Sequence, residues 1–443
     1  MTDRIALKQR IMRKVEALLD ELMESPNAPK TIDEIEDAAL KLRQRAGEIV
    51  AQELADAARE EAVPVGDAPD AAAPQSHTVE CPCGRKARYK GEATRSVVTM
   101  VGGVTLSRPY YYCRRCDAGL CPVDRLLGLP EGAYTPRVQR EVARVSALMP
   151  FTGAARLLYD LSGVSVSAKE AQHLATRIGE RVLEQRERER QAAMAGEEPP
   201  GRTRTPDVLY LEADGVMTPM TDGYKETKVG LARGLRDDGE EAFTNQYTAT
   251  LENAEAFGEH WYALALRSGL QTAKQVVVLG DGAAWIWNQA GYHFPEAEQI
   301  LDVFHATEHL YEAARSAYGE SAEETLLFGN ARKAELHEGR INAILSALHD
   351  LAQQEPHAKE VVRQTIGYIE NNRRRMDYPR YRQMGLSIGS GAAESGCKQV
   401  ITQRLKGAGM RWKELGAQAI SALRCLILSD QWPQHGRPLF ATS

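Results

Sequence analysis

Two pairs of cysteines restrict the fold of this chain more than any other feature of its sequence. Cys81-x-Cys83 and Cys113-x2-Cys116 are separated by 29 residues. These residues include two segments with strand character, RSVVTMV and VTLSRPYYY, joined at Gly102-Gly103. Zinc prefers four soft donors in a tetrahedron, and two tight turns can supply them. The pattern therefore predicts a small β zinc ribbon over residues 80–128, in which Cys81, Cys83, Cys113 and Cys116 hold a structural Zn²⁺.

The alternative is that these cysteines are ordinary buried thiols, although packing alone explains poorly why four of them flank one hairpin. Cys121 lies outside both pairs and is expected to be structural rather than a zinc ligand. The chain has seven cysteines, and thiols gathered in CxC and CxxC pairs favour a metal site in a reducing cytoplasm over a disulfide framework. No apolar run approaches the ~20 residues of a membrane helix, and no apolar segment follows the charged N-terminus. We therefore expect a cytoplasmic protein with no membrane partner.

The pattern of apolar and polar residues changes along the rest of the chain. The chain's 443 residues suffice for roughly two to four domains. The predicted organisation is a helical hairpin over 1–64, a linker over 65–79, the ribbon over 80–128, a helical region with a helix-turn-helix over 129–200, an α/β domain in two parts over 206–310 and 383–430, a helical segment over 311–382 between those parts, and a tail over 431–443. A further linker is expected over 195–207, where Pro and Gly are frequent.

The two helical regions suggest different roles. The hairpin has apolar residues at helical spacing on each arm, and such a pair must bury its apolar stripe against a partner chain or against the body of the protein. We expect it to bring subunits together in a homodimer or higher oligomer. In the second region a short turn over 163–167 separates two helices, with Ser167 as the N-cap of the second helix. Most such pairs do not read DNA, but the basic ribbon just upstream favours DNA binding here.

The α/β domain is predicted from a series of apolar strands. VLYLEAD ends at Asp214, KETKVGLARGL and NQYTATL follow, QVVVLGD ends at Asp281, and QILDVFH ends at His305. Strands that are first antiparallel and then alternate with helices favour an RNase H-like sheet over a doubly wound nucleotide-binding fold. Gly280-Asp281-Gly282 does not match the glycine-rich phosphate-binding motifs.

Three acids are candidates for a catalytic site. Asp214 and Asp281 each end a strong strand, and Glu394 lies in GSGAAESGCKQ at the start of a helix. If the two strands are neighbours, their carboxylates meet at one end of the sheet, where hard oxygen ligands suit Mg²⁺ or Mn²⁺. Two such ions can activate a water or a 3′-hydroxyl and stabilise the leaving oxygen of a phosphodiester. Taken alone, any one such acid is more often a turn residue or a helix cap.

The distribution of charge favours a nucleic-acid partner, although the net charge is −6. The acids are concentrated before the ribbon, whereas residues 81–200 carry 19 Lys and Arg against 13 Asp and Glu. Residues 371–413 carry ten basic residues and two acids, and local positive regions matter more for DNA than the sum does. The residues expected to contact DNA phosphates, or in one case to stack on an unpaired base, are Lys398, Arg404, Lys406, Arg411 and Trp412. The alternative is that these residues are simply solvated helix faces.

Several of these segments together carry a family resemblance. They are VTLSRPYYYCRRCDAGLCPVDRLLGL, YLEADGV, VVVLGDGAAWIWNQA, DVFHATEHL and GSGAAESGCKQVITQRLKGAGMRW. In content and in order they resemble the DDE-type transposases of bacterial insertion sequences of the ISKra family, over about residues 80–443. The resemblance implies an RNase H-like catalytic domain with an all-helical insertion before the last acid. It also implies that Asp214, Asp281 and Glu394 are the three catalytic acids, and that Asp302 and His305 match an accessory acid-x2-His motif.

The function expected from these features is DNA transposition. The protein would bind the terminal inverted repeats of its element, cleave DNA with two Mg²⁺ or Mn²⁺ ions and join the ends to target DNA. One alternative is a structure-specific nuclease that does not join ends, and another is a zinc-dependent DNA-binding regulator with an unused nuclease fold. HATEH at 305–309 has the histidine spacing of a helical zinc site, but it lacks the Glu after the first His that HExxH proteases need. His305 and His309 could therefore also be structural.

Overall fold

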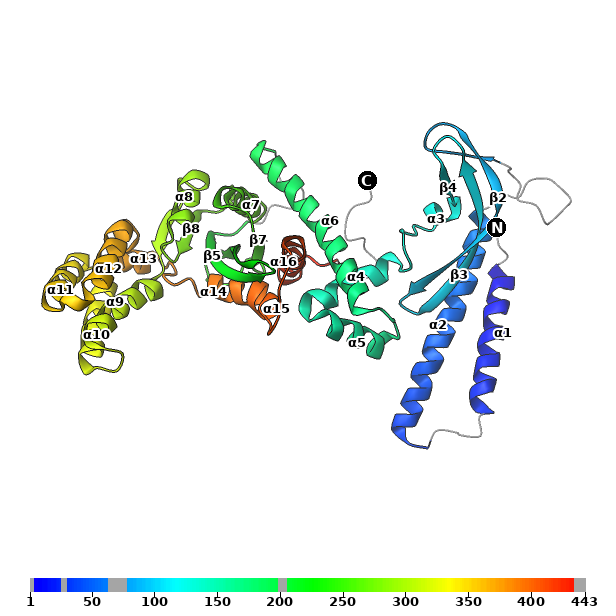
Figure 1. Ribbon diagram of the computed structural model, residues 1–443, viewed down its shortest axis with the longest axis horizontal. Helices are drawn as coiled ribbons and strands as arrows, with labels where there is room; N and C mark the ends of the chain where they lie inside the picture. The colour runs from blue at the N-terminus through cyan, green and yellow to red at the C-terminus, as the bar shows by residue number, and fades with distance from the viewer. Residues whose placement is uncertain (1–3, 25–29, 63–77, 198–204, 434–443) are drawn as a thin grey trace. The chain divides into compact units, whose positions relative to one another are not determined.

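The computed structural model describes residues 4–24, 30–62, 78–197 and 205–433 (Figure 1). The chain divides into two compact units, residues 1–175 and 176–443. The division falls within α6 (Ala168–Met194) rather than in the linker expected over 195–207. The linker over 65–79 and the tail over 431–443 lie almost entirely outside the described residues.

The first unit begins with the expected pair of helices, α1 (Arg4–Met23) and α2 (Ile32–Ala62). The carboxylate of Glu53 on α2 joins them, because it is buried and lies 3.0 Å from the Arg10 guanidinium and 2.6 Å from the Lys14 ammonium of α1. On α2, Gln52 accepts a hydrogen bond from the Thr105 N–H and donates one to its carbonyl, each at 2.8 Å. The hairpin therefore packs on the body of its own chain, which was one of the two options that its sequence left open.

The ribbon is a four-stranded antiparallel sheet rather than a single hairpin. Its strands, in spatial order, are β1 (Thr78–Glu80), β2 (Lys86–Thr99), β3 (Gly102–Cys113) and β4 (Ala118–Leu120). The turn between β2 and β3 consists of Met100 and Val101, so the predicted turn at Gly102-Gly103 was wrong. Thr99 pairs with Gly102, whose φ of +121° favours glycine, and the Thr99 hydroxyl accepts the Val101 N–H and donates to the Gly102 carbonyl.

Three helices follow a short α3 (Pro122–Leu126): α4 (Pro136–Leu148), α5 (Phe151–Ser162) and α6. Val138 and Val142 of α4 pack with Leu158 of α5 and with Leu174 of α6 in a small apolar core. The Ser167 hydroxyl accepts a hydrogen bond from the Glu170 N–H at 3.1 Å, which confirms Ser167 as the N-cap of α6.

The second unit is built on a mixed five-stranded sheet, which confirms the α/β class. Its strands are β5 (Val208–Met220), β6 (Gly223–Leu235), β7 (Gln246–Thr250), β8 (Gln275–Gly280) and β9 (Glu298–Leu301), in the order β7-β6-β5-β8-β9. β5, β6 and β7 are antiparallel, whereas β5, β8 and β9 are parallel. Helices α7 (Ala254–Arg267) and α8 (Ala284–His293) connect the later strands. Trp261 of α7 comes so close to Gly230 of β6 that a Cβ there would lie 3.0 Å from the indole ring.

Two strand ends differ from the prediction. β5 does not end at Asp214 but continues to Met220, because β6 pairs with it over its whole length. β9 ends at Leu301 rather than at His305, because the Asp302 carboxylate accepts the N–H groups of Phe304 and His305 and starts a helix there.

The remaining regular elements of the described chain are helices, including those in the stretch expected to lack strands. They are α9 (Val303–Tyr318), α10 (Glu323–His337), α11 (Ile341–Gln354), α12 (Lys359–Asn372), α13 (Tyr378–Gln383), α14 (Gly391–Cys397), α15 (Gln403–Leu405) and α16 (Glu414–Leu428), with short helical turns at Pro356–Ala358, Arg373–Arg375 and Lys398–Thr402. α9 to α12 pack on one another, and α14 packs on β5 and β6. No described helix is both long and apolar enough to cross a membrane.

Candidate metal centres

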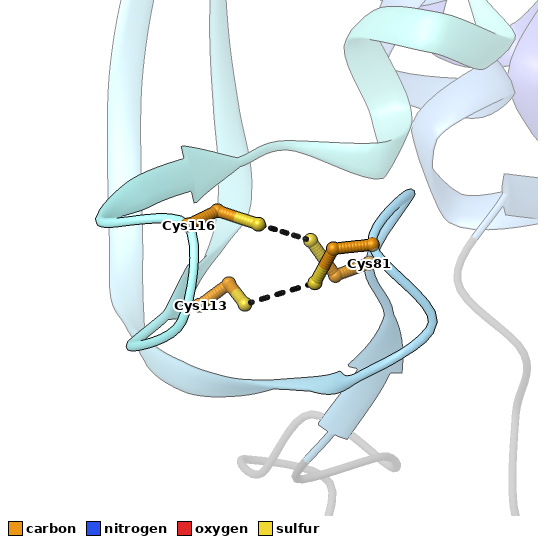
Figure 2. A group of neighbouring side chains, drawn as sticks. Cys81, Cys113 and Cys116 are labelled. Carbon is orange, nitrogen blue, oxygen red and sulfur yellow. Dashed lines mark hydrogen bonds between the residues drawn. The ribbon is translucent and has the colours of Figure 1, made fainter.

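The four paired cysteines form a compact cluster at one end of the ribbon. Cys81 and Cys83 lie in the turn between β1 and β2, Cys113 is the last residue of β3, and Cys116 lies in the turn before β4. All four sulfur atoms lie within 4.8 Å of one another. Figure 2 shows the labelled thiols of Cys81, Cys113 and Cys116 directed towards a common centre.

The chemistry of this cluster suits a soft divalent metal. The sulfur atoms of Cys81 and Cys116 are 3.8 Å apart, as are those of Cys83 and Cys113. A hydrogen bond with the Cys116 thiol, aided by the Arg85 N–H, lowers the pKa of Cys83 to about 7. The hydrogen bond between the Cys83 and Cys116 thiols in turn raises the pKa of Cys116 to about 12. Four sulfurs from two turns could therefore hold a metal such as zinc. Cys121 is not part of the cluster and directly precedes α3.

A second candidate centre lies at the carboxyl ends of the parallel strands in the other unit. Glu212 of β5 pairs with Leu279 of β8 in the parallel ladder. Two residues further along the chain in each case are Asp214, within β5, and Asp281, directly after β8, so the two aspartates lie at the same edge of the sheet. β9 extends this edge, because Leu301 pairs with Gly280 and Asp302 follows. The carboxyl ends of parallel strands are where α/β proteins place their ligands.

The two aspartates interact electrostatically. Burial, and then the charge of Asp281, raise the pKa of the Asp214 carboxyl, while the Gly215 N–H at 2.6 Å opposes this shift. Asp281 Oδ1 accepts the N–H of Ala283 at 2.9 Å, which fixes the turn after β8. The Tyr368 hydroxyl of α12 donates to the Asp281 carbonyl at 2.6 Å. The helices after β9 therefore contact the same turn.

Asp302 and His305 form a second pair at this edge. Asp302 is 2% exposed, and its Oδ2 atom lies 3.6 Å from His305 Nδ1. The interaction with Asp302, supported by the charges of Asp281 and Asp214, raises the pKa of His305 to about 9. The histidine therefore adds a positive charge beside the two aspartates.

Glu394 is placed differently from the two aspartates. It lies on α14 and is exposed. Within the described residues, its carboxylate does not join Asp214 and Asp281 in a group whose oxygens lie within 4.8 Å of one another. Cys397, one helical turn further along α14, is buried, and burial together with the neighbouring Asp214 carboxylate raises the pKa of its thiol. The structure thus brings α14 to the acid edge without gathering all three carboxylates.

Comparison with known proteins places the chain in a family. A model of an uncharacterised protein family, UPF0236, matches residues 82–431. The chain belongs to this family. No curated protein matches the chain. The match covers the acid edge and three of the four clustered cysteines, whereas Cys81 lies one residue before it.

The residues expected to contact DNA divide into two groups in this UPF0236 protein. Lys398, Lys406 and Arg411 are exposed, as contacts to phosphate require. Arg404 and Trp412 are buried, with 1% and 6% exposure. The Trp412 indole donates to the Leu405 carbonyl at 2.9 Å, and the Arg404 guanidinium lies 5.0 Å from the indole ring. In this structure these two predicted DNA contacts are not accessible, because the side chains are buried and pack against each other.

One buried acid at this edge was not predicted as functional. Glu212 is 0% exposed and lies on the same face of β5 as Asp214. Its Oε2 atom accepts the Ala393 N–H of α14 at 2.9 Å, and its Oε1 atom lies 3.7 Å from the Arg233 guanidinium. Burial raises the pKa of Glu212 to about 7. An acid inside the apolar strand VLYLEAD was the available signal, since buried charges are rare without a partner.

The histidines of HATEH do not form a metal site in the described part of the chain. His305 faces Asp302, whereas the His309 ring packs 4.0 Å from the ring of Tyr368. Burial lowers the pKa of His309. This arrangement gives no support to the protease alternative.

Proposed function

We propose that this UPF0236 protein is a DDE-type DNA transposase that binds the ends of its insertion sequence and catalyses metal-dependent strand cleavage and strand transfer. The observation on which the proposal depends is the parallel register of β5 and β8, which brings Asp214 and Asp281 to one edge. The resemblance to ISKra-family transposases gives these two acids their proposed catalytic role.

The topology of the sheet supports an RNase H-like domain. An antiparallel meander of three strands, extended on the side of its first strand by two parallel strands, is the arrangement expected of that fold. The order β7-β6-β5-β8-β9 has this form. The helices α9 to α13 lie between β9 and α14 in the chain, where the resemblance implies an all-helical insertion.

The proposed metal ligands are Asp214, Asp281 and Glu394. Side chains three residues apart share a helix face, so the Cys397–Asp214 contact directs the face that bears Glu394 towards β5. When bound, Mg²⁺ or Mn²⁺ would stabilise negative charge on the phosphodiester and lower the pKa of an attacking water or 3′-hydroxyl. The His305 side chain, with its raised pKa, would add positive charge beside the scissile phosphate.

DNA binding is proposed for the first unit and for the exposed cations after α14. A zinc ion held by the four cysteines would fix the ribbon, and the ribbon with α5 and α6 would contact the terminal inverted repeats. Lys398, Lys406 and Arg411 would contact phosphates near the acid edge. Ile5, Met12 and Leu19 are exposed at seven-residue spacing on α1, which supports the hairpin as the contact between subunits. The protein would act in the cytoplasm, bound to the nucleoid.

The test is a strand-transfer assay with purified full-length protein. A labelled duplex that carries the end of the element would be incubated with target DNA and with Mg²⁺, Mn²⁺ or EDTA. The proposal predicts nicked and joined products in the presence of either ion and none with EDTA. Cleavage without joining would favour the nuclease, and sequence-specific binding without cleavage would favour the regulator.

A further inference from the structure

Residues 387–393, here called the strap, lead from the helices after β9 into the first turn of α14. They form hydrogen bonds with the sheet and with the residues that follow β9. The Ser387 N–H donates to the Tyr210 hydroxyl at 3.0 Å, and the Ile388 carbonyl accepts the Val303 N–H at 2.9 Å. The strap is thus tied to β5 and to the first residue of α9 before α14 begins.

Two buried carboxylates hold the end of the strap that leads into α14. Asp302 Oδ2 accepts the Ser390 N–H at 2.7 Å and also the Ser390 hydroxyl. Glu212 Oε2 accepts the Ala393 N–H at 2.9 Å. The Ala393 N–H also donates to the Ser390 carbonyl at 2.9 Å, so Glu212 supplies a second, acidic acceptor to the first turn of α14.

One face of β5 makes contact with the C-terminal segment at three successive points. Side chains at alternate positions of a strand share a face, and Tyr210, Glu212 and Asp214 are such a series. They meet Ser387, Ala393 and Cys397 in turn. The position of α14 relative to Asp214 is therefore set by the same strand that bears Asp214.

A carboxylate at position 212 is a costly way to hold a helix, which argues for a specific role. Burial of a charge carries a large desolvation penalty unless hydrogen bonds and an opposite charge offset it. Here the Arg233 guanidinium, which also lies 4.5 Å from the Tyr210 ring, supplies the opposite charge. The Ala393 N–H occupies Oε2, whereas Oε1 has no hydrogen-bond partner in the described part of the chain and lies 3.7 Å from the Arg233 guanidinium.

We propose that Glu212, together with Asp302, is a positioning residue that holds α14 against the sheet and thereby sets the place of Glu394 relative to Asp214 and Asp281. This inference rests on the proposed function, because it assigns a purpose to the position of Glu394. It also makes a claim about local stability that does not depend on activity.

The test combines hydrogen exchange with the cleavage assay on the full chain. In Glu212→Ala the Ala393 N–H keeps only the Ser390 carbonyl as an acceptor. A hydrogen bond to a charged group is worth roughly a tenfold to hundredfold change in a local equilibrium. We expect amide exchange in the peptide that spans 390–397 to be faster by about that factor. The rate of cleavage at saturating DNA should fall while the DNA affinity stays unchanged. Glu212→Gln keeps a carbonyl acceptor and should recover most of both properties.

A matched control separates this effect from a general loss of charge. Glu298 is an acid at the opposite end of the parallel strands, where it pairs with Arg380 at 2.6 Å. Glu298→Gln should leave exchange in 390–397 and cleavage as in the wild type. If Glu212→Ala does not fold, Ser390→Ala removes only the hydroxyl contact to Asp302 and should accelerate exchange in the same peptide to a smaller extent.

The two proposals can fail separately. Faster exchange in the variants, in a protein whose wild type cleaves no DNA, would support the positioning role and refute the transposase. Wild-type exchange over 390–397 in every variant that folds would overturn the positioning role. So would a Glu212→Ala protein that cleaves at the normal rate.

Discussion

The two candidate metal centres of this protein differ in how their ligands are brought together. In the ribbon, four thiols come from two turns that are joined by one hairpin, and their sulfur atoms already lie within 4.8 Å of one another. At the acid edge, Asp214, Asp281 and Glu394 come from two strands and a distant helix. Asp214 and Asp281 interact, whereas Glu394 stays exposed. The first centre is closed by local structure, and the second is assembled by the topology of a whole domain.

This difference suggests a division of roles. A closed site of four sulfurs leaves no position for a substrate and is typical of structural zinc. An open edge with carboxylates from several elements can change its ligands as it binds DNA and metal. Damage to the ribbon should therefore weaken folding and binding, while damage to the acid edge should abolish chemistry and leave binding intact.

The largest effect is expected from loss of one acid at the edge. Asp281→Asn keeps the size of the side chain and its contact with the Ala283 N–H, but it removes the charge that a divalent ion needs. Because metal ions account for much of the barrier lowering in phosphoryl transfer, cleavage should fall by several orders of magnitude. Affinity for element-end DNA, and its dependence on salt, should change little, since phosphate contacts from Lys and Arg dominate both.

Asp214→Asn and Glu394→Gln sharpen this test. If the three acids act as one unit, each variant should lose as much activity as Asp281→Asn, and double variants should be no worse. The exposed position of Glu394 makes it the critical case. Near-normal strand transfer by Glu394→Gln would remove Glu394 from the site and leave an edge of two aspartates.

The second largest effect is expected in the ribbon. Cys113→Ser should release about one zinc ion per chain and unfold the ribbon, since small metal domains are rarely stable without their ion. Metal content by mass spectrometry and affinity for element ends would both fall. Cys121→Ser is the matched control, because Cys121 directly follows β4 but does not belong to the cluster, and this variant should keep the metal. A metal-free Cys81→Ser/Cys113→Ser protein with native fold and DNA affinity would contradict the structural role.

The sequence was informative about the two centres to different degrees, for a physical reason. The spacing of the cysteines predicts that their thiols lie close together, since two turns at the same end of a hairpin allow few other arrangements. Asp214 and Asp281 lie at one edge only because β5 and β8 are neighbouring strands. The sequence did not show this pairing, so the prediction had to assume it. The mixed sheet and its long helical segment followed from hydrophobic periodicity.

The errors came from partners that lie far away in the chain. β5 extends past Asp214 because β6 pairs with it, and Trp412 is buried because its backbone pairs with the end of β5, where the Trp412 N–H donates to the Pro219 carbonyl at 3.1 Å. The basic and aromatic residues near Glu394 suggested a DNA-binding surface. The sequence pattern did not show which of these side chains are exposed, such as Lys406, and which are buried, such as Arg404. The proposed role of Glu212 depends on the first turn of α14, whose Ala393 N–H donates to it across 181 positions of the chain.

A third prediction concerns assembly through the first unit. Because α2 packs on β3, deletion of the hairpin would expose the ribbon, so substitution on α1 is the cleaner test. Met12→Glu and Leu19→Glu place charges on the exposed stripe and should shift the protein from an oligomer to a monomer, as measured by light scattering. Zinc content and circular dichroism should stay unchanged. An unaltered mass would exclude this stripe as the contact between subunits.

The smallest expected effect is a pH dependence of the stability of the hairpin. It tests whether α1 is held to α2 mainly by charge. Hydrogen bonds from Lys14 and Arg10 lower the pKa of the buried Glu53 carboxyl. Because the folded pKa lies below that of the unfolded chain, the ion pairs stabilise the fold above the unfolded value of about 4.5. This stability is lost as the pH falls through the lower, folded pKa.

The contribution should be about 1 kcal/mol, since both cations are partly exposed and solvent screens them. Comparison of the wild type with Glu53→Gln isolates the contribution of the Glu53 ion pairs, because the other acids titrate equally in both proteins. The free energies of unfolding, measured by denaturant titration, should differ at pH 6 and converge below the folded pKa. A difference that persists at low pH would mean that Glu53 acts through packing or neutral hydrogen bonds. The apolar contacts of α2 with the ribbon would then have to account for the stability of the hairpin.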